Sequence, residues 1–102
     1  MSKVHGYCRV AFANEEEMAQ QCKIIQDYCK SNGLEVDEYF CDNGVSGLKL
    51  DRDALQKLLK VLREGDIVVV KDYSRISRNL LQLIEITKSI YQAGATHKVI
   101  NQ

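Results

Sequence analysis

Arginine is the residue type whose placement in this chain suggests chemistry. Four of the five arginines lie in three short clusters, whereas lysine is spread along the whole sequence. The clustered residues are Arg9, Arg52, Arg75 and Arg78, and only Arg63 lies elsewhere. A guanidinium group presents a planar fork of donors that matches phosphate oxygens, so this clustering indicates an oxyanion site. The sequence therefore predicts a site suited to phosphoryl transfer.

The same region lacks an evident nucleophile. Two residues after Arg9, where a hydroxyl could attack a bound phosphoryl group, the chain has Ala11. A methyl group has no lone pair to donate, so the predicted site can bind an oxyanion without being able to attack it.

Composition limits the classes of protein that fit. The chain has 102 residues, 45% of them hydrophobic and 27% charged, which predicts one globular domain. Basic and acidic residues number 14 each, so any affinity for nucleic acid must come from local charge. We expect weak duplex binding by the isolated domain. With neither a long apolar run nor a signal peptide, we expect a cytoplasmic protein with no membrane partner.

Cysteine usage also favours the cytoplasm. The four cysteines are Cys8, Cys22, Cys29 and Cys41. They contain no CxxC pair and form no zinc-like spacing with His5 or His97. We expect four free thiols that act as small core residues, with no metal and no cofactor.

The elements that must position the arginines alternate between strand and helix. Expected strands cover residues 3–10, 34–40, 66–70 and 97–101, and residues 41–50 and 71–78 form a mobile loop and a turn. Expected helices begin at the caps Asn14, Asp51 and Asn79 and end at Gly33, Gly65 and Gly94. This order predicts an α/β fold, a three-layer αβα sandwich with a mainly parallel central sheet. Such sheets bind ligands at the carboxyl ends of their strands, where all three arginine clusters fall.

Three motifs carry a resemblance to a known family. They are Tyr7-Cys8-Arg9-Val10, then 42–47 (DNGVSG) with Asp51-Arg52, and then 70–78 (VKDYSRISR). In this order and spacing, over nearly the whole chain, they resemble the catalytic domain of the serine recombinases, which comprise resolvases, invertases and large serine integrases. The sequence of residues 71–75 (KDYSR) is most similar to the large-recombinase branch.

The resemblance implies metal-free transesterification of DNA through a phosphoserine link. It assigns phosphate binding to Arg9, Arg52, Arg75 and Arg78, with Gln21 near the pocket and Ser46 in the mobile loop. It places Ala11 at the nucleophile position and Ser74 where many members have aspartate. It also implies DNA and a homo- or hetero-oligomeric recombinase as partners. The family continues into a dimerisation helix and a DNA-binding domain, which residues 1–102 are expected to lack.

Ala11 has two competing explanations. An engineered change would normally leave the neighbouring residues alone, but Phe12 and Ala13 also replace small polar residues. Three successive departures favour a naturally degenerate copy. The leading hypothesis is then an inactive recombinase domain, and the alternative is an accessory paralogue that binds DNA or an active recombinase. A receiver-like signalling domain is disfavoured, because it needs acidic residues where Arg9 and Ala11 stand.

Plainer interpretations exist for individual residues. The arginines could be surface ion-pair partners, Gln21 a solvated helix residue, and Ser74 and Ser77 helix caps. His5 and His97 are expected to be ordinary strand residues, and the acidic run at 15–17 is expected to mark a helix start.

Overall fold

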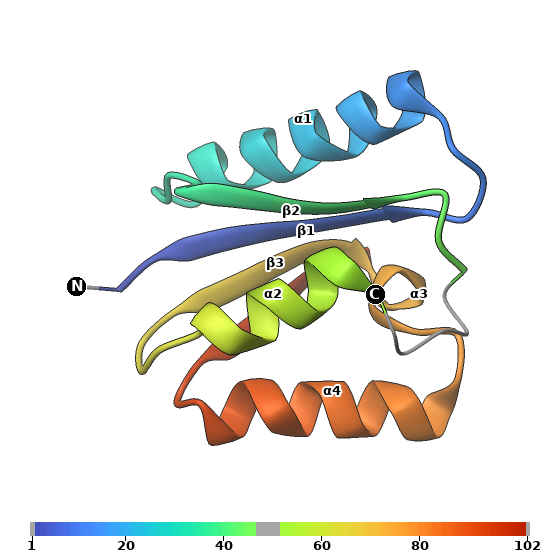
Figure 1. Cartoon of the computed structure of the whole chain (residues 1–102). Helices are drawn as coiled ribbons and strands as arrows, with labels where there is room; N and C mark the ends of the chain where they lie inside the picture. Colours follow the sequence, from blue (N-terminus) through green and yellow to red (C-terminus); the bar gives the residue numbers. More distant parts are fainter. Residues whose placement is uncertain (1, 47–51, 102) are drawn as a thin grey trace.

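The fold is a parallel sheet between two helical layers. A computed structural model describes residues 2–46 and 52–101. The sheet has the order β2-β1-β3-β4, with every pairing parallel. Its strands are β1 (Val4–Val10), β2 (Glu38–Asn43), β3 (Ile67–Asp72) and β4 (Thr96–Asn101). Figure 1 shows α1 (Glu15–Ser31) on one face and α2 (Asp53–Val61) and α4 (Leu80–Gln92) on the other. The αβα expectation is confirmed.

Each face of the sheet has its own apolar core. The core under α1 contains Val4, Cys8, Val10, Met18, Ile25, Cys29 and Val69. The core under α2 and α4 includes Tyr7, Leu55, Leu58, Val68, Val70, Ile86, Ile90 and Val99. Successive residues of β1 and β3 therefore alternate between the two cores, as expected for strands covered on both faces.

Two helix starts and two helix ends lie where the sequence signals predict them. The Asn14 side chain accepts a hydrogen bond from the Glu17 N–H at 3.0 Å, and Asn79 accepts one from Gln82 at 3.1 Å. Gly33 (φ 71°) and Gly94 (φ 81°) have the left-handed conformation that commonly ends helices. Among the described residues, no helix is long and apolar enough to cross a membrane.

The predicted bounds of the second strand were wrong. Its alternating pattern begins at Leu34, but β2 begins at Glu38 and continues through Asn43. The cause is pairing with β1, which aligns Cys8 with Cys41 and continues to the carboxyl end of both strands. Leu34 lies before the strand and packs on the core under α1.

The two segments that carry arginine motifs also differ from expectation. Residues 71–78 are not a simple turn, because β3 continues to Asp72 and a short helix α3 (Tyr73–Ile76) follows. Part of the expected mobile loop and the predicted cap Asp51 lie outside the described residues. The N-cap position of α2 is Arg52, whose side chain makes no capping hydrogen bond.

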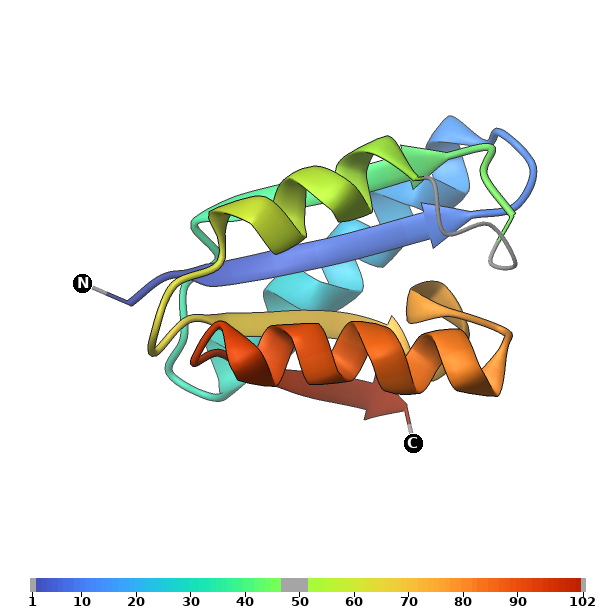
Figure 2. The same ribbon diagram turned by 60° about the horizontal axis from the view of Figure 1, so that its bottom comes forward.

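The strand order creates a natural ligand position. The chain passes from β1 outward to β2, then returns to β3 and β4 on the other side of β1. The winding direction thus reverses between β1 and β3, and ligands of open α/β sheets bind at the carboxyl side of such a reversal. In Figures 1 and 2, α3 lies at this end of the sheet.

Candidate functional site

Arg9, the penultimate residue of β1, is completely buried and holds two loops in place. Its Nε and Nη2 donate to the carbonyls of Arg75 (3.2 Å) and Ser74 (2.7 Å), and its Nη1 donates to the carbonyl of Val45 (3.0 Å). These bonds join the end of β1 to α3 and to the segment after β2. The side chain therefore determines the shape of the site.

Arg52 reaches the same short helix from the start of α2. It is also completely buried, and its two Nη atoms donate to the carbonyls of Arg75 (3.1 Å) and Ile76. Its guanidinium carbon lies 5.8 Å from the centre of the Tyr7 ring, within range for a cation–π contact. Its Nε has no hydrogen-bond partner within the described part of the chain.

Arg75 and Arg78 complete the cationic group. Arg75 Nη1 donates to the Arg9 carbonyl at 3.0 Å, and Arg75 Nε lies 3.6 Å from Asp72 Oδ1. Arg78 is exposed, two residues beyond α3. Burial lowers the pKa of Arg9, and the positive charges of Arg52, Arg75 and Arg78 lower it further. Arg9, Arg52 and Arg75 therefore converge through hydrogen bonds to backbone carbonyls, and Arg78 lies exposed just beyond α3.

Asp42 is a buried residue of this site whose role sequence reasoning missed. Its Oδ2 accepts from the Tyr7 hydroxyl at 2.7 Å, and its two oxygens accept from the N–H groups of Ala54 (2.9 Å) and Leu55 (3.1 Å). Asp42 therefore caps α2 from a neighbouring strand. Burial raises the pKa of Tyr7 despite the opposing charge of Arg52, which keeps the phenol a hydrogen-bond donor.

Gln21 is buried, so the interpretation of this residue as a solvated helix residue was wrong. Its Nε2 donates to the Arg9 carbonyl at 2.9 Å, and its Oε1 accepts from the Arg9 N–H at 3.3 Å. The last paired residue of β1 on the β3 side is Tyr7, so Gln21 satisfies the backbone of β1 just after the two strands separate. It positions Arg9 through the main chain.

Ala11 is exposed just after β1, beside the arginine site. It lines a cavity of about 380 Å³ together with Arg52, Ser46, Asp42, Gly44, Val45 and Asp53. The cavity therefore places the predicted nucleophile position, one buried arginine and the loop serine around one space. The other predicted site residues are not among the described residues that line it: Arg9, Gln21, Ser74, Arg75 and Arg78.

The two serines of the third motif have local partners. Ser74 Oγ donates to Asp72 Oδ1, and Ser77 Oγ accepts from the Asn79 N–H at 3.0 Å. Ser77 is buried just before α4. These contacts support structural roles at the ends of β3 and α4.

At the opposite end of the sheet, His5 is a residue of β1, as expected, and it has a buried partner that the sequence did not indicate. It is buried, and its Nε2 donates to Asp66 Oδ2 at 2.9 Å. Asp66 also accepts from the N–H groups of Lys3 (2.9 Å) and Arg63 (3.1 Å). The pair was missed because 61 residues separate its members.

The amino-acid sequence matches known proteins over nearly the full length of this chain. A family model described as "Resolvase, N terminal domain" matches residues 4–102. A resolvase of Clostridium perfringens is 36% identical over 91% of this chain and 46% of its own length. The Tn917 resolvase of Enterococcus faecalis is 33% identical over 83% of this chain and 42% of its own. The chain thus spans about half the length of the curated relatives it matches.

Solved structures give the same result at the level of the fold and the family. The N-terminal catalytic domain of TP901-1 integrase superposes with a TM-score of 0.90 and 27% identity, covering 98% of this chain and 79% of that one. The catalytic domain of the IS607-like serine recombinase ISC1926 TnpA gives a TM-score of 0.89 and 25% identity, covering 98% and 68%. With these matches and the family model in agreement, the chain belongs to the resolvase N-terminal domain family, the catalytic domain of serine recombinases.

Proposed function

We propose that this chain is the phosphodiester-binding catalytic domain of a site-specific DNA recombinase, and that Ala11 leaves it unable to cleave DNA. The observation that carries the proposal is an excess of buried positive charge. Arg9, Arg52 and Arg75 meet around α3, and Asp72 is the one carboxylate within 4 Å of them among the described residues. These arginines outnumber the carboxylates at ion-pair distance from them, and a bound anion would offset the unbalanced charge.

The residues divide into two proposed roles. Arg9 and Gln21 position the site, because their polar groups are engaged with the backbone at the end of β1, with α3 and with Val45. Arg52, Arg75 and Arg78 contribute charge to the phosphate, with the Nε of Arg52 available for a hydrogen bond. Ser46 lines the cavity, where its hydroxyl is placed to donate a hydrogen bond to a phosphate oxygen.

In the proposed family chemistry, a serine hydroxyl at position 11 attacks the phosphorus. The 3′ oxygen of the DNA leaves, and the protein stays linked to the 5′ end. Arginines stabilise the charge on the transferring group, and no metal takes part. Ala11 lacks only the attacking oxygen atom. The domain therefore still binds the anion but does not carry out the covalent step.

The partners follow from the whole recombinase rather than from this domain. We propose that the full-length protein acts in the cytoplasm on DNA, as a homo-oligomer or together with another recombinase. Dimerisation and sequence-specific DNA binding would come from segments other than residues 1–102.

A second candidate function is an accessory paralogue that occupies a recombination site or pairs with an active recombinase. The substitution at Ala11 favours it, and so does Phe12, which is 88% exposed directly after that position. An accessory protein needs the fold and the charged site but no nucleophile.

A phosphate titration tests the anion site. Two exposed arginines provide a matched pair, Arg78 inside the motif and Arg63 after α2. With inorganic phosphate added to labelled protein, we expect amide shifts at Arg9–Ala11 and at 74–78 that weaken as salt rises. Arg78→Ala should reduce the apparent affinity, whereas Arg63→Ala should leave it unchanged. Equal behaviour of the two variants would show a general charged surface and would contradict the proposal.

A further inference from the structure

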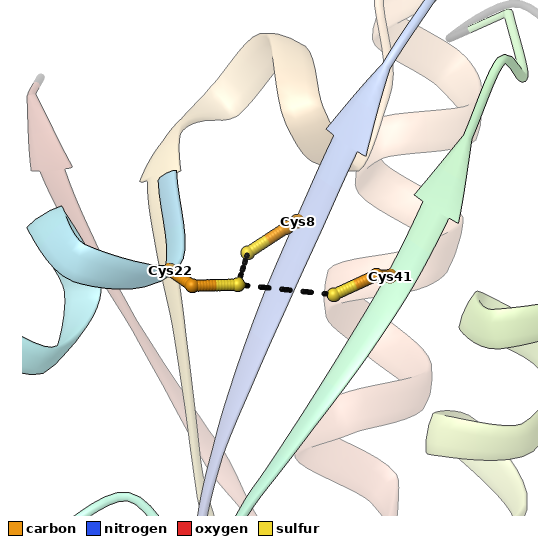
Figure 3. A group of neighbouring side chains, drawn as sticks. All are labelled: Cys8, Cys22 and Cys41. Carbon is orange, nitrogen blue, oxygen red and sulfur yellow. Dashed lines mark hydrogen bonds between the residues drawn. The ribbon is translucent and has the colours of Figure 1, made fainter. Parts of the chain in front are cut away.

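Three cysteines from three elements meet on the α1 face of the sheet. Cys8 belongs to β1, Cys22 to α1 and Cys41 to β2, as Figure 3 shows. The Sγ atoms of Cys8 and Cys22 are 3.6 Å apart, and those of Cys22 and Cys41 are 3.9 Å apart. All three sulfur atoms lie within 4.8 Å of one another. Because Cys8 and Cys41 are register partners on adjacent strands, their side chains lie on the same face.

The size of this sulfur triangle fits a metal ion. A zinc–thiolate bond is about 2.3 Å long, so three sulfurs around one ion in a plane lie about 4.0 Å apart. The observed 3.6 and 3.9 Å are close to that value. A disulfide needs a separation of about 2.05 Å, and all four cysteines are free. Thiolates select soft cations such as Cu⁺ and Zn²⁺ over hard ones.

Access to the triangle comes from one side. Cys8 is buried, Cys22 is partly buried and Cys41 is exposed on the edge strand β2. A cation can therefore enter past Cys41 and reach Cys8. Three protein ligands with one open side suit either a three-coordinate ion or a four-coordinate ion that keeps a solvent ligand.

We propose that Cys8, Cys22 and Cys41 form a three-thiolate site for one thiophilic d¹⁰ cation, Cu⁺ or Zn²⁺. The site lies on the opposite face of the sheet from the arginines and does not depend on the proposed function. Each ligand directly adjoins a residue that shapes the arginine site: Arg9, Gln21 or Asp42. A bound cation would therefore tie together the three segments that carry those residues.

Binding has a predictable dependence on pH. Cysteine binds a metal ion as the thiolate, so a cation must displace the thiol protons of its ligands. We expect proton release on binding and an affinity that rises with pH.

The competing interpretation is that these cysteines are merely small core residues. Cys29 is the matched control, because it is a free, buried thiol on the same helix and lies outside the triangle. The exposed Cys41 is the ligand whose replacement disturbs packing least. Comparing Cys41→Ala with Cys29→Ala therefore separates metal binding from the mere presence of a thiol, and Cys22→Ala provides a second ligand variant.

The experiment is a competitive titration of reduced protein under an oxygen-free atmosphere. Zn²⁺ and Cu⁺ are each added against a chromophoric chelator, and Cd²⁺ reports sulfur ligation through its ultraviolet charge-transfer band. We expect one cation to bind per chain and thiol protons to be released. The titration with the preferred cation, Zn²⁺ or Cu⁺, should give the higher affinity. Cys41→Ala and Cys22→Ala should lower the affinity by at least the roughly tenfold that losing even an outer-shell partner costs. Cys29→Ala should bind as the unmodified chain does.

Two results would overturn the site. The first is equal affinity in the unmodified chain and Cys41→Ala. The second is a stoichiometry of one cation per two chains, since that would place the ion between molecules. Neither result affects the phosphate titration, so the two proposals fail independently.

Discussion

The side-chain amide of Gln21 binds both backbone polar groups of Arg9, donating to the carbonyl at 2.9 Å and accepting from the N–H at 3.3 Å. It replaces a neighbouring strand at the point where β1 and β3 have separated. On the β3 side of β1, the hydrogen bonds to the backbone of Arg9 therefore come from a side chain of α1, whereas on the other side Arg9 still pairs with Asp42 of β2.

Gln21→Ala is expected to destabilise the fold by about 1–3 kcal/mol, because it leaves the buried N–H of Arg9 without a partner. Urea unfolding measures this difference as a shift of the midpoint at constant slope. Gln20→Ala is the control, since Gln20 is exposed on the same helix, and its effect should stay within about 0.5 kcal/mol. Equal effects of the two variants would show that the amide contacts contribute nothing.

Asp42→Ala is expected to cost about 2–4 kcal/mol. It removes the cap on the N–H groups of Ala54 and Leu55 and leaves the buried Tyr7 hydroxyl unpaired. Asp53→Ala, which changes an exposed acid in the first turn of the same helix, should cost less than about 1 kcal/mol. Thermal or urea unfolding of both variants tests the difference, and a larger loss in Asp53→Ala would contradict the capping role.

Local signals explain which parts of the fold could be predicted. Caps such as Asn14 and Asn79 act on N–H groups three residues away, so the sequence contains both partners. The β-branched run before Lys71 similarly identifies a buried strand. The start of β2 was mispredicted because Leu34 and Val36 alternate with acidic residues although they precede the strand, and pairing with β1 begins only near Glu38.

The site likewise has features that the sequence predicts and features that it does not. The convergence of the arginine clusters follows from the parallel direction of the strands, which the alternation of strands and helices predicts. The roles of Asp42 and Gln21 depend on partners 12 or more residues away. The cysteine triangle joins residues separated by 14 and 19 positions, a spacing that matches no metal motif. Such groups become visible only when the sheet brings them together.

Acid stability should depend on Asp66. Burial alone would raise its pKa, but hydrogen bonds from His5 and from the N–H groups of Lys3 and Arg63 outweigh burial and lower it below its usual 3.8. A carboxyl with a lowered folded pKa stabilises the protein above its unfolded pKa and loses this contribution as pH falls through the folded value. Asp66→Asn should therefore cost about 2 kcal/mol near neutral pH, and the difference should shrink below about pH 4. A difference that is constant between these pH values would contradict this assignment.

The last prediction concerns DNA cleavage. Loss of a covalent nucleophile costs on the order of 10⁶ in rate, so the full-length gene product with Ala11 should leave no protein-linked nicks in supercoiled DNA that carries its recombination site. Ser74 Oγ is committed to Asp72, and Ser77 is buried against Asn79, so neither is placed to substitute. Ser46 lines the same cavity as Ala11, so it is the serine to test as a substitute nucleophile. A covalent adduct mapped to Ser46 by mass spectrometry would show an active enzyme with a relocated nucleophile, and Ser46→Ala would then abolish it. Ala11→Ser alone in residues 1–102 should not produce nicks, because this domain is proposed to obtain its dimer contacts and DNA-binding elements from the rest of the recombinase.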